Sequence, residues 1–164
     1  MRLNLVIICA MAGTLAACSD GSDPAQDAAD VAEIEAMHDM PAIEQISPQH
    51  IRYPDIEKNN LFGASCGFAP GNSMKVLFLA QDEHGYMKLD DKIVTLAPDK
   101  GSAELPLTGF SKYDGKEFSV TITLDENGKS SEGIEQTKWQ GRMVVRDHKD
   151  RVTFDREGLV GCGA

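Results

Sequence analysis

The serine in residues 63–67, GASCG, has the spacing of a nucleophile elbow. In serine hydrolases the G-x-S-x-G pattern holds the serine on a sharp turn between a strand and a helix of a large parallel sheet. Here Pro70 and Gly71 follow almost at once, and a helix does not form through that pair. We therefore interpret the two glycines as turn residues beside Cys66 and not as part of a catalytic site.

Two other groupings have residue types that could do chemistry. Met37, His38 and Met40 supply thioethers and an imidazole, which suit Cu(I), but they also continue the helical spacing of Ile34 and fit a small apolar stripe. Three pairs of adjacent carboxylates fall in turn-forming segments, whereas acid–base catalysis needs a carboxyl group perturbed by burial or by neighbours. These pairs are Asp82–Glu83, Asp90–Asp91 and Asp125–Glu126. We predict no catalytic set, metal site or cofactor, and so no enzyme.

The elements that would position any site are mostly strands. Phe118, Val120, Ile122 and Leu124 alternate with polar residues, as in a strand with one buried face. Four more segments have a similar composition, are separated by turn residues and are also predicted to be strands: 74–80, 92–97, 138–146 and 151–156. The spacing predicts a mainly β fold, a small antiparallel β-sandwich or barrel. Trp139, Met143 and Val145 would lie on the same face of their strand and are expected to face the core.

The chain ahead of these strands has a different composition. Residues 19–29 are small, polar and acidic, which predicts disorder. A short helix is expected from a cap at Asp27 or Asp30 to about Met40. Residues 46–60 contain Pro48 and Pro54 and are expected to be an irregular lead-in.

The charge is concentrated in the same N-terminal region. The chain has 16 basic and 26 acidic side chains, a net charge of −10. Residues 19–44 contain eight of the acidic residues and no Lys or Arg, so residues 45–164 carry a net charge of only −3. An acidic, self-repelling segment is typical of an extended spacer. The absence of clustered Lys and Arg argues against a nucleic-acid partner.

The N-terminus has the layout of an export signal. Arg2 precedes an apolar run at residues 5–10 and a small-residue segment, and this stretch is too short for a membrane-spanning helix. Leu15-Ala16-Ala17-Cys18 resembles the lipobox of bacterial lipoproteins, in which the signal is cut before a cysteine whose thiol and new amino group are acylated. The resemblance implies lipidation of Cys18. An ordinary signal peptide with cleavage nearby and a free Cys18 is the alternative.

This resemblance divides the chain into a signal peptide (1–17), a lipidated acidic tether with a short helix (18–45) and a single β-rich domain (46–164). It implies that the protein has the membrane as a partner and is attached to it through the covalent lipid on Cys18. Ser19 after the cysteine favours a periplasm-facing place in the outer membrane of a Gram-negative cell. The inner membrane and the cell surface are the alternatives.

With Cys9 removed in the signal and Cys18 acylated, Cys66 and Cys162 are the pair left in the domain. In an oxidising compartment, without C-x-x-C spacing, they are expected to form a structural disulfide that joins the last strand to the first. Such a bridge closes a loop of about 97 residues, worth about 4.7 kcal/mol in the chain-entropy model. Two free thiols or a shared metal-ligand set are the alternatives.

Two further resemblances concern the domain. The segments GASCGF (63–68), Trp139-x-Gly141 and GCGA (161–164) resemble small uncharacterised lipoproteins of Gram-negative bacteria, which implies an architecture and no activity. Residues 108–113, TGFSKY, are similar to the S-G-x-x-Y loop of membrane-bound inhibitors of C-type lysozyme. Thr replaces Ser, the Tyr is one place later, and EFSVTI stands where that family has F-W-x-K-G. The resemblance implies a partner-binding loop with Gly109, Ser111, Lys112 and Tyr113.

The sequence therefore predicts a lipid-anchored envelope protein with a non-enzymatic binding or structural β domain and an envelope protein as a partner. Inhibition of a C-type lysozyme is the alternative function.

Overall fold

The computed structural model describes residues 23–38, 42–132 and 136–163, in two compact units, Met1–Pro41 and Ala42–Ala164. The first unit contains helix α1, Pro24–His38. Asp23 Oδ1 accepts a hydrogen bond from Ala25 N (3.0 Å), and Pro24 occupies the first turn, where its missing N–H costs nothing. The expected helix is confirmed, but it begins at Pro24, so residues 24–29 are helical where the composition predicted disorder. Cys18 and Met40 lie outside the described residues.

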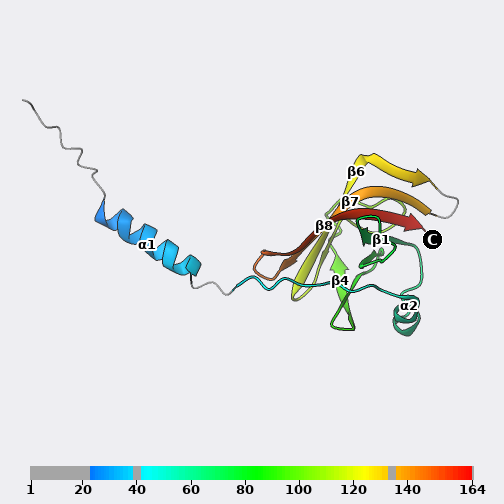
Figure 1. The fold of residues 1–164 in the computed structure, drawn as a ribbon, viewed down its shortest axis with the longest axis horizontal. Helices are drawn as coiled ribbons and strands as arrows, with labels where there is room; N and C mark the ends of the chain where they lie inside the picture. The colour runs from blue at the N-terminus through cyan, green and yellow to red at the C-terminus, as the bar shows by residue number, and fades with distance from the viewer. Residues whose placement is uncertain (1–22, 39–41, 133–135, 164) are drawn as a thin grey trace, which may run out of the picture. The chain divides into compact units, whose positions relative to one another are not determined.

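The second unit is a closed antiparallel barrel in which each strand pairs with the next and β8 returns to β1 (Figure 1). The strands are β1 (Ser65–Pro70), β2 (Phe78–Ala80), β3 (Gly85–Leu89), β4 (Lys92–Pro98), β5 (Lys112–Asp114), β6 (Phe118–Glu132), β7 (Gln136–Asp147) and β8 (Val152–Gly163). The mainly β prediction is confirmed, and of its two forms the barrel is the one found.

The sequence-based strand assignments differ from the structure in several places. The segment at 74–80 is a strand only from Phe78, and Met74 is 82% exposed. Of the two glycines interpreted as turn residues, Gly63 does lie in a bend, with φ +126°, but Gly67 lies within β1. β1 pairs with β8 along its whole length. The short strands β3 and β5 were not predicted. Asp90 and Asp91 are both left-handed (φ 47° and 58°) and form the predicted turn, of the type that suits a two-residue hairpin.

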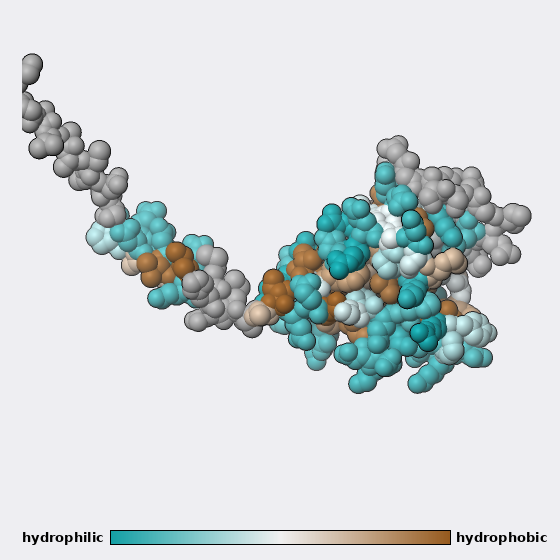
Figure 2. All heavy atoms as spheres, in the orientation of Figure 1, coloured by the Kyte–Doolittle hydropathy of each residue, from teal (hydrophilic) through white to brown (hydrophobic). Residues whose placement is uncertain are grey.

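The core fills the barrel with aromatic and aliphatic side chains. Phe68, Phe78, Met87 and Tyr113 are fully buried, as are Met143 and Val145, while Trp139 packs against this cluster at its edge. An eight-stranded barrel has an interior that side chains can fill, so the wall encloses a packed core. On the face shown in Figure 2, hydrophilic side chains cover most of the described barrel surface.

Helix α2, Tyr53–Asn59, corrects the expectation of an irregular lead-in at 46–60. Pro54 lies in the first turn, where proline favours a helix, and Asp55 Oδ2 accepts a hydrogen bond from Arg52 N (2.9 Å). Asp55 also binds Lys88 Nζ of β3 at 2.8 Å, and this hydrogen bond, with one from the Arg52 backbone, lowers the pKa of Asp55. Beside the helix, Ile51, Leu61 and Leu79 form a second small core.

The strand connections define two ends of the barrel. The hairpin end carries the β3–β4, β5–β6 and β7–β8 turns, and the loop end carries the β2–β3 turn and the β4–β5 connection, residues 99–111. Residues 45–51 form a strap attached to the barrel: Ile46 N donates to Thr153 O (3.1 Å) and Gln49 N to Lys88 O (2.8 Å). Figure 1 shows this segment in cyan beside the strands, leading to α2.

Candidate functional site

The disulfide between Cys66 and Cys162 marks the loop end. The two residues are partners in the register of β1 and β8, with Cα atoms 4.0 Å apart. The predicted bond and the predicted joining of the last strand to the first are both confirmed. Pro106 O and Thr108 O lie 3.1 and 3.4 Å from Cys66 Sγ, so the β4–β5 connection passes over the bridge. The disulfide is therefore a fixed base beneath that loop.

The loop at 105–110 is closed on itself and held at both ends. Leu105 N donates to Gly109 O (2.9 Å), and the side chains of Leu105 and Phe110 are buried in the core. Gly109 has φ +84°, and a Cβ at this position would lie 2.7 Å from Tyr113 Oη and 3.2 Å from the Ala80 carbonyl. Glycine is therefore required at this close approach.

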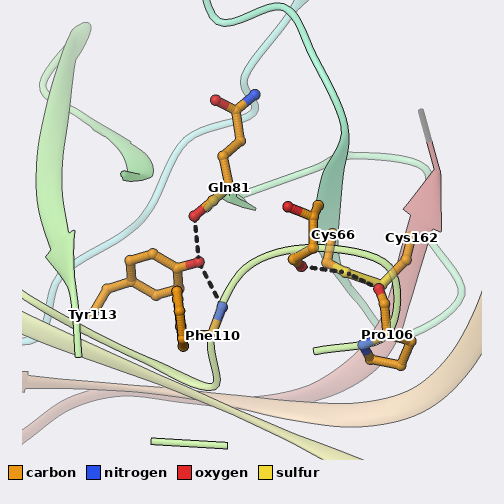
Figure 3. Close-up of a disulfide and its surroundings, with 7 residues drawn as sticks. Cys66, Gln81, Pro106, Phe110, Tyr113 and Cys162 are labelled. Atoms are coloured by element: carbon orange, nitrogen blue, oxygen red, sulfur yellow. Dashed lines mark hydrogen bonds between the residues drawn. A yellow bond between two sulfur atoms is a disulfide. The ribbon is translucent and has the colours of Figure 1, made fainter. Parts of the chain in front are cut away.

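Tyr113 supports the loop from inside the barrel. Its ring is fully buried and meets Phe78 edge to face, with centroids 5.3 Å apart. Its hydroxyl donates to Gln81 O (2.8 Å) and accepts from Phe110 N (2.9 Å), as Figure 3 shows. Burial raises the pKa of Tyr113, against the opposing effect of the hydrogen bond from Phe110. The phenol therefore stays protonated at neutral pH and connects the β2–β3 turn with the loop.

Ser111 and Lys112 lie at the partly exposed stem of the loop. Ser111 N donates to Ala103 O (2.7 Å), and Ser111 O accepts from Ile122 N (2.7 Å). Lys112 Nζ lies 3.2 Å from Asp114 and 3.4 Å from Asp99, and the hydrogen bond to Asp114 is the main cause of its raised pKa. The four residues predicted as a partner-binding loop are thus brought together, two of them buried (Gly109, Tyr113) and two partly exposed (Ser111, Lys112).

The tip of the loop is Leu107, which the sequence analysis did not single out. Its side chain is 67% exposed although its backbone has φ +80°, a left-handed conformation that costs a leucine energy. A hollow of about 410 Å³ beside it contains two carboxylates, Asp82 and Glu104. The site therefore presents an apolar side chain next to negative charge on a backbone fixed by the disulfide and Tyr113.

Ser65, the nucleophile of the elbow pattern, is the first residue of β1 and is not at a strand–helix turn. Within the part of the chain that the structure describes, no three His, Cys, Asp or Glu side chains are grouped so as to hold a metal ion. The helices of that part are too short or too polar to cross a bilayer. No protein-family model, curated protein or solved structure matches this chain.

Proposed function

We propose that this protein is a lipid-anchored envelope protein that binds a protein partner through the loop at 105–110 and performs no catalysis. The proposal of a binding site rests on the positive φ and the exposed side chain of Leu107. A strained, exposed leucine on a rigid loop is stable only because the surrounding structure holds it, and such strain concentrates at binding sites. A preorganised loop also binds with a smaller loss of conformational entropy.

The chemistry of the partner follows from the surface around the tip. Leu107 would enter an apolar pocket, while Asp82 and Glu104 beside it favour basic side chains at the rim of that pocket. Because Tyr113 and Gly109 are buried, they act by shaping the loop, and contact with the partner falls to Leu107 and its neighbours.

The lipid anchor rests on Leu15-Ala16-Ala17-Cys18, with its signal-like start. The disulfide supports it in two ways. It is typical of an exported protein, and it accounts for both cysteines of the barrel, so that neither is a partner for Cys18. Several acyl chains on one residue give stable anchoring, where one chain is marginal. With Ser19 next, we propose a periplasm-facing place in the outer membrane.

Cross-linking in intact cells that make the protein tests the binding. Leu107→Asp places a charge at the tip, and Asp tolerates positive φ better than Leu, so the loop keeps its shape. We expect this variant to reduce the cross-linked partner at least tenfold, as loss of a binding hot spot does. Met74→Asp is the matched control, because Met74 is an exposed apolar residue on another connection.

Equal cross-linking of wild type and Leu107→Asp would contradict the proposed site. The identity of the captured protein decides the alternative function: a C-type lysozyme, lost on Leu107→Asp and retained on Met74→Asp, would make the chain an inhibitor of that enzyme. Any other protein with the same dependence supports a different envelope partner.

A further inference from the structure

A second hollow, of about 750 Å³, lies at the hairpin end of the barrel, away from the loop at 105–110. Four apolar side chains that pack against the core form its floor: Ile46, Leu89, Val94 and Phe118. They come from the strap, from β3 and β4 and from the start of β6. The mouth of a small barrel is a common place for a ligand, and here it has an apolar base.

The wall of this hollow is held by hydrogen bonds. On the strap, Gln45 Nε2 donates to Val152 O (3.3 Å), and Gln49 Oε1 accepts from Asp91 N (2.8 Å). In the β7–β8 turn, which directly precedes Val152, Asp147 Oδ1 accepts from the backbone N of Lys149 and of Arg151, each at 2.9 Å. The strap and the β7–β8 turn therefore keep the hollow in shape without a ligand.

The charges on the rim are not balanced. Asp147 and Arg151 form a partly buried pair, 2.7 Å apart, and hydrogen bonds from Arg151 help to lower the pKa of Asp147 to about 2, against the effect of burial. This pair is internally neutral. The other charged rim residues are Glu44, Asp90, Glu117 and Lys92, with His148 beside them.

Apart from the Asp147–Arg151 pair, the rim thus carries three carboxylates and one lysine. None of the ion pairs found in the described ranges involves Glu44, Asp90 or Glu117. Their charge is available to a ligand above the apolar floor.

We propose that the hairpin end binds a small cationic amphiphile, an amine with an aromatic or alkyl body. The body would bury apolar surface against Phe118 and its three aliphatic neighbours. The ammonium would lie among the rim carboxylates, where opposite charge and the face of an aromatic ring both favour it. This site is separate from the proposed partner loop and does not depend on it.

A titration followed by nuclear magnetic resonance tests the assignment. The full chain with Cys18→Ser avoids detergent, itself an amphiphile, and makes the result independent of lipidation. The probes are phenylbutylamine, phenylbutanol and phenylbutyrate, which share one apolar body. We expect saturable shifts at the amides of the strap, the β3–β4 turn and the β7–β8 turn. The amine should bind about tenfold more tightly than the carboxylate, with the alcohol between them.

Charge-removing variants separate this explanation from simple apolar adsorption. Glu117→Gln and Asp90→Asn should each reduce the preference for the amine over the alcohol by about threefold, the size expected for an exposed charge pair. Asn also fits the left-handed conformation at position 90. Glu83→Gln, an exposed carboxylate in the β2–β3 turn at the loop end, is the matched control and should leave the preference for the amine unchanged. Equal affinity for the three probes, shifts elsewhere, or no saturable binding would overturn the proposal.

Discussion

At the scale of single residues, Tyr113 shows what a motif can and cannot predict. The similarity of residues 108–113 to a known binding loop predicts that Tyr113 belongs to a partner-binding loop. The structure buries the ring against Phe78. The packing depends on Gly85, because a Cβ there would lie 2.5 Å from the Phe78 ring and 2.7 Å from that of Tyr113. No short motif contains this contact.

Tyr113→Phe tests the supporting role. It leaves Phe110 N and Gln81 O without their buried partner, which costs about 1–3 kcal/mol of unfolding free energy. Urea unfolding measures this cost. Tyr86→Phe is the control and should change stability by less than about 0.5 kcal/mol, since no hydrogen bond to its hydroxyl occurs within the described residues. Equal stability of Tyr113→Phe and wild type would exclude the support.

Leu107 marks the limit of prediction at the same scale. An exposed leucine in a turn-rich segment is ordinary in a sequence, and its positive φ appears only when the chain is folded. The local signals are Pro106, directly before it, and Gly109, two residues later, which both favour a tight loop.

At the scale of elements, strands with clean alternation were predictable and short ones were not. Residues 118–124 alternate regularly and lie within β6. The bounds of β1 escaped prediction because Gly67 and Pro70 within it, and the glycines that flank it, resemble turn chemistry. Its position is fixed by pairing with β8 at the far end of the chain. Helix α2 was missed because Pro54 was interpreted as a breaker, although a proline in the first turn favours a helix.

The pairing of β1 with β8 gives a prediction about the disulfide. Replacing Cys66 and Cys162 together by Ala removes a cross-link between residues 96 apart, which should lower the unfolding free energy by about 2–5 kcal/mol. Denaturant unfolding of the oxidised wild type and the double variant measures the difference. A midpoint unchanged by the substitution would mean that the strand pairing alone determines the stability.

At the scale of the whole molecule, the sequence did not distinguish a β-sandwich from a β-barrel. Closure depends on the pairing of β1 with β8. The cysteines predicted that the first and last strands are joined, but a single disulfide is compatible with both a sandwich and a barrel. The hollow at the hairpin end was unpredictable because its lining comes from residues 44–47, 89–94, 117–118 and 147–153. The loop at 105–110 was partly predictable, since it is continuous in sequence.

The central claim is that Cys18 attaches this barrel to a membrane while Cys66 and Cys162 stabilise it. The most direct measurement is the intact mass of the protein purified from membranes, with sequencing of its N-terminal peptide. We predict a chain that begins at Cys18 and carries a diacylglycerol and an amide-linked acyl chain. The Cys18→Ser variant should leave the membrane fraction and become soluble, whereas the Cys9→Ser variant should stay in the membrane fraction. An unmodified Cys18, or a mature chain that begins at another residue, would contradict the account.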